Sequence, residues 1–452
     1  MKPSVQKLIG RRSFFKGVAA GLGAMSFLSE ADIEGAVQNV NRNSTPSQLK
    51  ITDLRVAVVA EAPFTCPIIR IDTNQGVSGF GEARDGASKT YALMLKSRIL
   101  GENPCNIDKI FRKLKQFGGH ARQGGGVSAI EMACWDLAGK AYGVPVYQML
   151  GGKFRDKIRL YADTTESRDG TESGRRLKGR MEKGFTWLKV DFGIDLLEGT
   201  PGTLSRPLGY DTSNRGNVMH PFTGIEITDK GIALLSEYVG KIREVIGIDI
   251  PLSSDHYGHI GVNSCIRLAR AMQKHQLAWM EDMVPWQLTG LLKQIHDAVD
   301  IPILTGEDIY LKEEFARLVN EKAVDIIHPD LATAGGILET KKIGDLAMEG
   351  GVPMAMHFAG TPVSFMANVH CAAATENFLV LEHHSVDVPW WEDIVTGIPK
   401  PIFQKGFAVV PDLPGLGVEL NQEVIKQHLR EPGFFEPTTE WDKERSHDRL
   451  WS

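Results

Sequence analysis

The sequence lacks the cysteine spacing that zinc sites and dithiol redox motifs use. Its five cysteines are scattered, and no two stand in C-x-x-C order, so neither kind of site is expected. The odd number leaves at least one thiol outside any disulfide within the chain, so we do not expect disulfides to hold the fold together. The cysteines are Cys66, Cys105, Cys134, Cys265 and Cys371.

Clusters of basic residues are also missing after residue 16. The chain has 51 basic and 56 acidic residues, which gives a formal net charge of −5. A protein that follows nucleic-acid phosphates needs a positively charged surface, so nucleic acid is not an expected partner. The 452 residues and 42% hydrophobic content are typical of a globular enzyme with room for more than one domain.

No hydrophobic run is long enough to suggest a membrane span. The apolar run at residues 18–28 covers 11 positions, whereas a spanning helix needs about 20. A basic start precedes it and contains the sequence RRSFFK at residues 11–16, which resembles the twin-arginine export signal of bacteria. We therefore expect residues 1–30 to be an export signal and the protein to be periplasmic or exported. The alternative is a disordered basic tail.

Residues 31–155 change from a linker to a folded domain. The stretch 31–48 is polar and suits a linker, so the folded part should begin near Leu49. Short β-branched runs separated by turns such as residues 74–76 (NQG) predict antiparallel strands, and helical patterns follow. We predict an α+β capping domain at 49–155, completed by a C-terminal segment at 389–452 that packs on it.

Eight short apolar runs alternate with helix-length segments from residue 156 onward. They span 226 residues, from 158 to 383, or about 28 per unit, close to the roughly 30 of a barrel built from eight βα units. Runs this apolar suit parallel strands that are buried on both faces. The sequence thus predicts an α/β fold in which residues 156–388 form a (β/α)₈ TIM-like barrel.

The connection after the second predicted strand is unusually long. Residues 193–227 cover 35 positions without an apolar period. Loops of this length inside compact domains are often functional, and this one leaves the strand ends where barrel enzymes keep their sites. We predict a lid.

Three acidic residues stand where three consecutive strands should end. Asp255, Glu281 and Glu307 are separated by steps of 26 residues each (281 − 255 and 307 − 281). Equal steps of one βα unit would place three carboxylates side by side at one rim of the barrel. Such hard oxygen ligands suit Mg²⁺, which also relieves their mutual repulsion. A single carboxylate there would more often be a helix cap or an ion-pair partner.

The next two strands contribute Asp330 and His357. A carboxylate beside a histidine orients the imidazole and raises its basicity, which makes His357 a candidate general base. The alternative is a histidine that is simply hydrogen-bonded within the barrel wall.

Four stretches together resemble the mandelate racemase and muconate-lactonising branch of the enolase superfamily. The resemblance covers about residues 49–430 and implies a cap over the barrel and a reaction that begins with removal of the proton next to a carboxylate, with Mg²⁺ and a Lys or His base. The stretches are AIEMACWDLAGK at 129–140, LGGK at 150–153, the Asp/Glu/Glu rim, and PDL at 329–331 followed by GGI at 335–337.

The second strand argues against a racemase with two bases. Racemising members usually place a lysine base two residues after another lysine, but here the pair is Lys189 and Asp191, which share one face of the strand. With His357 as the single base, β-elimination is the more natural outcome. The expected reaction is dehydration of a sugar acid of aldonate or uronate type to a 2-keto-3-deoxy acid.

The acid for that elimination is left open. In the dehydratases that the chain resembles, a histidine two residues after the first metal ligand often serves, but Tyr257 stands at that position. Tyr257, His256, His259, His220 and His357 itself are all candidates.

Further substrate contacts are expected around the same rim. Glu382, at the end of the eighth strand, matches a glutamate that contacts the substrate or its leaving group in related enzymes, although an ordinary ion pair is an equal alternative. Arg122, in a glycine-rich stretch of the cap, could also reach the substrate. The predicted substrate-binding residues are Arg122, Asp191, His220, His256 and His259, and Lys189 and Tyr257 join His357, Asp330 and Glu382 as predicted catalytic residues.

Two other functions are compatible with the same residues. One is a racemase, epimerase or cycloisomerase that forms the same enolate, and the other is a sugar-acid binding protein that has no catalytic activity. In each case the partner is a small carboxylate, and a homo-oligomer is expected.

Overall fold

The computed structural model describes residues 45–119, 124–206, 224–255, 257 and 260–443. The predicted export signal lies outside these ranges, as do residues 207–223 of the predicted lid. The described ends of that lid form a short antiparallel pair, in which Leu204 lies opposite Ile227.

The first folded unit is an antiparallel sheet covered by helices, as the turn pattern predicts. Its strands run in the order β1-β2-β3, and β2 turns into β3 at Gly76, whose φ of 76° suits glycine. The long helix α6 is almost entirely buried and ends at Gly143, which adopts the left-handed conformation typical of a helix C-terminus. The elements are β1 (Ile51–Val59), β2 (Cys66–Thr73), β3 (Ser78–Glu82), α3 (Thr90–Leu93), α4 (Lys96–Ile99), α5 (Ile107–Leu114), α6 (Gly125–Tyr142) and α7 (Val146–Met149).

The second unit is a closed barrel of eight parallel strands, which confirms the predicted fold class. Each strand pairs with the next in chain order, and the last pairs with the first, where Glu382 lies opposite Tyr161. The strands are β4 (Lys157–Ala162), β5 (Leu188–Asp191), β8 (Leu252–Asp255), β9 (Met280–Glu281), β10 (Ile303–Thr305), β11 (Ile326–Ile327), β12 (Met354–Met356) and β13 (Phe378–His383).

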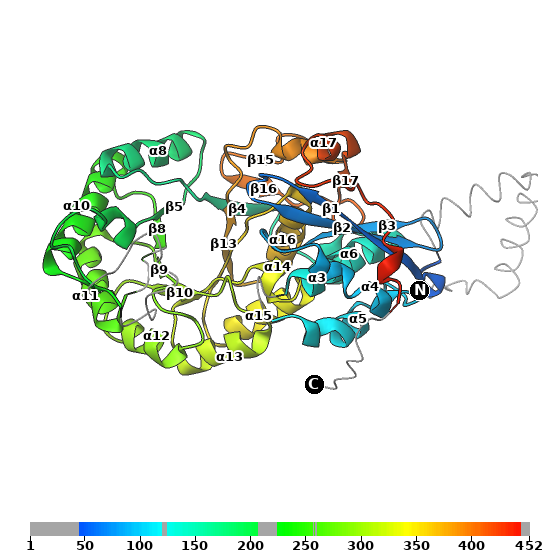
Figure 1. The fold of residues 1–452 in the computed structure, drawn as a ribbon, viewed down its shortest axis with the longest axis horizontal. Helices are drawn as coiled ribbons and strands as arrows, with labels where there is room; N and C mark the ends of the chain where they lie inside the picture. The colour runs from blue at the N-terminus through cyan, green and yellow to red at the C-terminus, as the bar shows by residue number, and fades with distance from the viewer. Residues whose placement is uncertain (1–44, 120–123, 207–223, 256, 258–259, 444–452) are drawn as a thin grey trace, which may run out of the picture.

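Helices surround the barrel on the outside, and the blue and cyan capping domain lies beside this ring in Figure 1. Their apolar faces pack on the strands, as expected for a sheet that is buried on both faces. The helices are α8 (Gly170–Glu182), α10 (Asp229–Ile246), α11 (Val262–Met272), α12 (Thr289–His296), α13 (Lys312–Glu321), α14 (Leu331–Ala334), α15 (Ile337–Glu349) and α16 (Pro362–Ala374).

The interior of the barrel is filled by an apolar cluster that forms a floor. Its members come from seven of the eight strand regions and include two tryptophans, whose rings are 5.1 Å apart. A barrel packed in this way is a solid support, so polar side chains can collect only above it. The cluster consists of Tyr161, Trp187, Trp279, Leu304, Ile326, Ala355 and Val380.

Two buried carboxylates of the cap hold it on the barrel. Glu131 on α6 accepts hydrogen bonds from the backbone N–H groups of Ile337 (2.6 Å) and Leu338 (3.0 Å) at the start of α15. Glu82 at the end of β3 accepts one from Thr361 N (2.9 Å), which caps α16. A side chain at Gly336 would collide with the Glu131 carboxylate, which explains the glycine pair before α15.

The C-terminal segment contacts both units. Near its end it pairs with β1, where Arg430 N donates to Val58 O (2.8 Å). The prediction named only the cap, but β16 also pairs with the barrel strand β4, with Ala408 opposite Ile158. Within the barrel, β4 pairs with β13 from Leu160 onward and with β5 at Ala162, so residues 157–159 are available for this pairing. The elements are β14 (Val395–Thr396), β15 (Phe403–Gln404), β16 (Phe407–Val409), β17 (Glu419–Leu420) and α17 (Gln422–Gln427).

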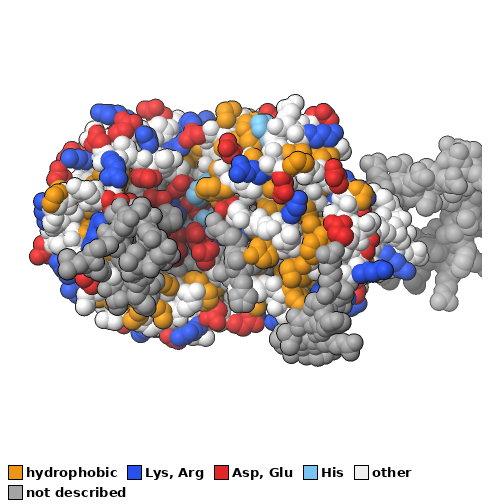
Figure 2. All heavy atoms as spheres, viewed as in Figure 1, with side chains coloured by type: hydrophobic (Ala, Val, Ile, Leu, Met, Phe, Trp, Pro, Cys, Tyr) orange, Lys and Arg blue, Asp and Glu red, His pale blue; other side chains and the backbone are white. Residues whose placement is uncertain are grey.

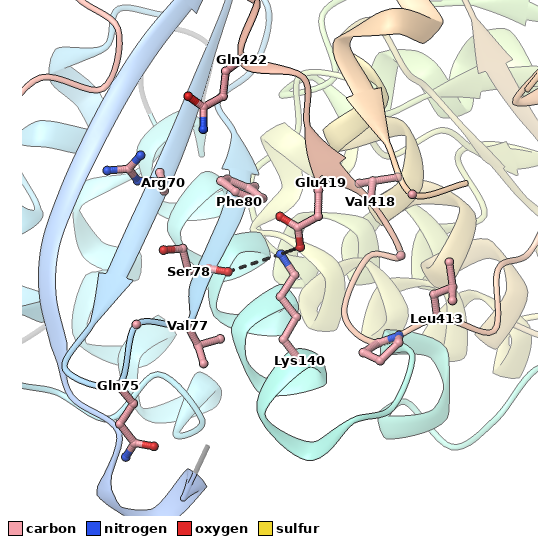
Figure 3. A pocket seen from close by; sticks show the side chains of 14 residues that line it. Arg70, Gln75, Val77, Ser78, Phe80, Lys140, Leu413, Val418, Glu419 and Gln422 are labelled. Carbon is pink, nitrogen blue, oxygen red and sulfur yellow. Dashed lines mark hydrogen bonds and ion pairs between the residues drawn. The ribbon is translucent and has the colours of Figure 1, made fainter. Parts of the chain in front are cut away.

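A groove marks the seam between this segment and the cap (Figure 3). Lys140 of α6 lies in it and forms an ion pair with Glu419 (2.7 Å), while its Nζ also donates to Ser78 O (3.3 Å). Its charge is balanced within the seam by a further pair with Asp136 (2.9 Å).

Among the residues described, no helix has both the length and the apolar character needed to cross a membrane.

Candidate active site

The three predicted carboxylates lie together at the C-terminal rim of the barrel. Asp255 ends β8, Glu281 ends β9, and Glu307 follows β10 by two residues. One oxygen from each lies within 4.8 Å of the others. In Figure 2, acidic side chains and histidines line a hollow in this face of the molecule. The spacing of 26 residues therefore reflects three neighbouring strands, and the oxygen-only donor set is compatible with a divalent cation.

Lys189 supplies positive charge beneath this cluster. Its Nζ lies 3.0 Å from Asp255, 3.2 Å from Glu281 and 3.0 Å from Glu382. Burial by itself would lower the pKa of Lys189, but the surrounding carboxylates outweigh it and raise this pKa well above its usual value. The lysine is therefore a fixed ammonium ion, which is a poor starting point for a base.

Glu281 is held in place by neutral groups as well. His328 Nδ1 lies 2.5 Å from its carboxylate, and Tyr161 lies 2.8 Å from the other ring nitrogen. Burial lowers the pKa of His328 to about 4, so this imidazole is neutral and acts as a hydrogen-bond donor to Glu281. Burial raises the pKa of Glu281 well above its usual value, and the nearby Asp255 carboxylate raises it further.

His357 and Asp330 form the pair that the sequence predicts. His357 Nδ1 lies 2.6 Å from Asp330 Oδ2, while His357 Nε2 lies 3.1 Å from Glu307. Asp330 is fixed in turn because its other oxygen accepts the N–H groups of Ala332 (2.7 Å) and Thr333 (3.1 Å). The carboxylate therefore sets the ring orientation and directs Nε2 towards the cluster.

Arg84 connects the cap to this site. It is only 2% exposed, and its guanidinium lies 3.2 Å from both Glu307 and Asp330. Burial alone would raise the pKa of Asp330, but Arg84 and His357 hold it below its usual value. Sequence reasoning missed this residue, although a charged Glu-Ala-Arg run at the end of β3 was a possible signal.

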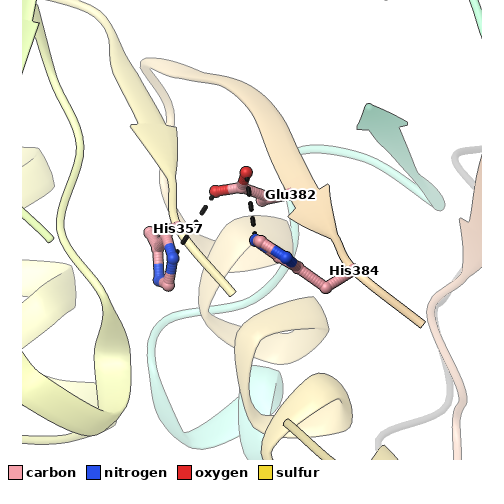
Figure 4. A group of neighbouring side chains, drawn as sticks. All are labelled: His357, Glu382 and His384. Atoms are coloured by element: carbon pink, nitrogen blue, oxygen red, sulfur yellow. Dashed lines mark ion pairs between the residues drawn. The ribbon is translucent and has the colours of Figure 1, made fainter. Parts of the chain in front are cut away.

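Glu382 lies between two histidines (Figure 4). Its carboxylate is 3.8 Å from His357 Nε2 and 3.2 Å from His384 Nε2. His384 also lies 3.3 Å from Asp163, which follows β4. Sequence reasoning did not assign a role to His384, even though it is two residues beyond Glu382, where strand alternation would have placed it on the same face.

Tyr257 is buried and makes contacts that the sequence did not predict. The strand ends at Asp255, so strand alternation does not fix the orientation of Tyr257, although it lies close enough to Asp255 and Glu281 that, besides burial, their charges raise its pKa. Its ring packs against Phe192, with 5.2 Å between the centroids, and its hydroxyl forms a short hydrogen bond with Ser254 Oγ. Since Ser254 donates its own hydrogen to Trp279 O, Tyr257 must be the donor to Ser254. Burial raises its pKa well above the usual value.

Asp191 lies at the end of β5, opposite Asp255 in the register of the two strands. It is partly exposed and shares a face with Lys189, as the sequence predicts. The remaining predicted substrate contacts, Arg122, His220, His256 and His259, lie outside the described residues.

A TIM barrel with a cap docked against it, a rim of three carboxylates and a histidine–aspartate pair defines an enzyme of the enolase superfamily. The chain belongs to the mandelate racemase/muconate lactonizing enzyme family. The model of the family's N-terminal domain matches residues 33–151, and the enolase C-terminal domain-like model matches residues 172–424.

Several proteins of this family are similar to the chain. The D-xylonate dehydratase of Haloferax volcanii is 33% identical over 84% of this chain and 89% of its own length. The structure of a mandelate racemase/muconate lactonizing enzyme-like protein from Rubrobacter xylanophilus has a TM-score of 0.75 at 30% identity and covers 87% of this chain and 100% of that one. The 3,6-anhydro-D-galactonate cycloisomerase of Zobellia galactanivorans has a TM-score of 0.71 at 25% identity, with 84% and 100% coverage.

Proposed function

We propose that the protein is a Mg²⁺-dependent sugar-acid dehydratase that converts an aldonic or uronic acid to a 2-keto-3-deoxy acid. The observation that carries this proposal is the His357–Asp330 pair, in which the second ring nitrogen of His357 lies 3.1 Å from Glu307, one of the three clustered carboxylates. A base next to an anion-stabilising centre is what removal of a proton adjacent to a carboxylate requires.

His357 is the general base in this proposal. Its Nδ1–H is held by Asp330, so Nε2 keeps the lone pair that accepts the α-proton of the substrate. Asp330 then stabilises the imidazolium that results. Arg84, which pairs with Asp330 at 3.2 Å, keeps that carboxylate ionised and in position.

Lys189 favours elimination over racemisation. A second base on the opposite side of the substrate would have to be neutral, but the three carboxylates around Lys189 Nζ keep it protonated. The residue two positions later, Asp191, is not a lysine. One base and a protonatable leaving group lead to loss of water.

Asp255, Glu281 and Glu307 fit a magnesium ion. They offer three hard oxygen donors within 4.8 Å of one another, and no sulfur or nitrogen donor belongs to the set. When bound, Mg²⁺ would stabilise the negative charge that develops on the substrate carboxylate. Lys189 and Arg84 keep the three side chains together by offsetting part of their repulsion.

The substrate class is supported by the relatives and by the polar character of the site. The Haloferax volcanii protein is named for dehydration of D-xylonate, and it shares one third of its aligned residues with this chain. A hollow lined by carboxylates and histidines suits a substrate that carries many hydroxyl groups (Figure 2).

The test is incubation of the purified full-length protein with a panel of aldonic and uronic acids that includes D-xylonate. Semicarbazide traps 2-keto products, and parallel samples contain MgCl₂ or EDTA. We expect a 2-keto-3-deoxy product from at least one acid, lost with EDTA and restored by Mg²⁺. Recovery of substrate with deuterium at the α-carbon, but without 2-keto product, would identify an epimerase or cycloisomerase instead. The absence of both exchange and product would favour a binding protein.

A further inference from the structure

The elimination needs a proton for its leaving group. Three protonatable groups among the described residues of the rim, Tyr257, Lys189 and His357, already have other roles. The Tyr257 proton is donated to Ser254. Lys189 directs its ammonium group at three carboxylates. His357 is the base. Among the described residues, the donor should therefore be another titratable group close to His357.

His384 meets that requirement by position. It follows β13, the strand next to that of His357, and the two rings are 5.7 Å apart. Its ring is enclosed by Asp163 on one side (3.3 Å) and Glu382 on the other (3.2 Å), yet its side chain keeps 15% exposure. Phe64, from the loop between β1 and β2, lies 5.9 Å from the ring, so this loop of the cap reaches the same place.

We propose that His384 is the catalytic proton donor, which transfers its Nε2 proton to the β-hydroxyl of the substrate; this inference rests on the proposed function. His384 Nε2 is buried and has no aligned hydrogen-bond partner among the described residues, although Glu382 Oε1 is 3.2 Å away. A proton on that nitrogen lies beside the Glu382 carboxylate, which keeps it close to His357.

The surroundings of His384 keep it protonated at neutral pH. Burial by itself would lower the pKa of His384, but Asp163 and Glu382 raise it to about 9. By contrast, burial lowers the pKa of the neighbouring His383 to about 3. His384 is thus protonated because it faces carboxylates, whereas His383 is neutral because it faces aromatic rings.

The step is balanced in protons and electrons. His357 Nε2 removes the α-proton, and the C–H electrons form the enolate. When the enolate collapses, a C=C bond forms between the α- and β-carbons, the β C–O bond breaks, and the oxygen leaves as water with the proton from His384. The resulting enol becomes the 2-keto acid. His357 then carries one extra proton and His384 lacks one.

Glu382 offers a return path for that proton. Its carboxylate contacts both histidines, and the nitrogen and oxygen ligand atoms of the three side chains lie within 4.8 Å of one another (Figure 4). A proton can pass from His357 to His384 across this carboxylate, so the site is reset without an external acid.

The decisive experiment compares two leaving groups in the His384→Asn variant. With D-xylonate, hydroxide needs a proton in order to leave, whereas 3-deoxy-3-fluoro-D-xylonate loses fluoride without an acid. We expect dehydration to fall by roughly 10²- to 10⁴-fold, the usual contribution of a general acid. Fluoride release and exchange of the α-proton in D₂O should stay within about tenfold of wild type.

Three controls make the result specific. His357→Asn should abolish dehydration, fluoride release and exchange together. His296→Asn, on the outside of the barrel beside Asp297 and Asp325, should behave like wild type. If His384→Asn loses fluoride release as severely as dehydration, or loses neither, His384 is not the donor. If wild type converts none of the acids in the panel, the proposed function itself fails.

Asp163→Asn provides a second test that does not depend on removing the imidazole. Dehydration should decline above about pH 9 in wild type as His384 loses its proton. Loss of the Asp163 charge should move this decline to lower pH, and a merely structural role would not. An unchanged profile would overturn the assignment. The charged or titratable groups around His384 are Asp163, Glu382, His357, Lys189 and the adjacent His383.

Discussion

Replacement of Lys189 by methionine tests whether the lysine and the metal share one set of carboxylates. The ammonium group is 3% exposed and lies 3.0 to 3.2 Å from Asp255, Glu281 and Glu382. Removing one partner of a buried ion pair leaves its counterpart uncompensated, which costs about 3–5 kcal/mol. We therefore expect the metal-free variant to lose about this much free energy of unfolding.

Magnesium should then stabilise the variant more than the wild type. Two unit charges 4 Å apart interact by roughly 4 kcal/mol at an effective dielectric constant of about 20. About a third of that energy is enough to change the affinity for Mg²⁺ tenfold. Loss of the nearby ammonium group should thus tighten Mg²⁺ binding by at least about tenfold. The increase in the free energy of unfolding depends on the ratio of the free Mg²⁺ concentration to Kd, and it is about 2.7 kcal/mol when that concentration is 100 times Kd.

The assay is thermal unfolding and calorimetry across a MgCl₂ titration, with CaCl₂ in parallel. Lys140→Met is the matched control, because Lys140 is also a largely buried lysine between two carboxylates, Asp136 and Glu419, but lies in the seam remote from the rim. It should lower stability without changing the response to Mg²⁺. Equal Mg²⁺ responses of wild type and Lys189→Met would refute the shared site.

Three further predictions concern other parts of the protein. Burial raises the pKa of Glu82 to about 8, above its value in the unfolded chain. The protonated side chain therefore contributes to the free energy of unfolding at low pH, and this contribution is lost as pH rises through about 8. Glu82→Gln should abolish this loss in denaturant titrations at pH 6 and 9, and an unchanged dependence of stability on pH would contradict the assignment. Asp330→Asn should lower kcat by roughly 10²- to 10⁴-fold with little change in KM, because His357 loses its orienting charge, and a change confined to KM in steady-state kinetics would argue against this role. We also propose that residues 1–30 direct export. Fused to a reporter, they should deliver it to the periplasm, and replacing both arginines at 11–12 by lysine should retain the reporter in the cytoplasm. Export of both fusions would exclude a twin-arginine signal.

The barrel and its carboxylate rim could be predicted from the sequence because each rests on a local and periodic signal. Strand-length apolar runs recur once per βα unit, and Asp255, Glu281 and Glu307 occupy the same place in consecutive units. In a closed parallel barrel, equal places in sequence become neighbours in space. The same logic paired Asp330 with His357.

Other parts of the site depend on contacts between segments that no local pattern connects. Arg84 reaches Glu307 across 223 residues, and that pairing exists only because the cap is docked on the barrel. The contacts of Tyr257 with Phe192 and Ser254 could not be predicted, because the alternation of side chains stops where a strand stops and a short apolar run does not show its exact end.

The sequence by itself determined which chemical groups the protein has and in which order the barrel presents them, because composition and periodicity are properties of the chain alone. Only the tertiary structure decided their charge states. His383 and His384 are neighbours in sequence, yet one is neutral and the other protonated, since the pKa of a buried group is set by the side chains that folding brings around it.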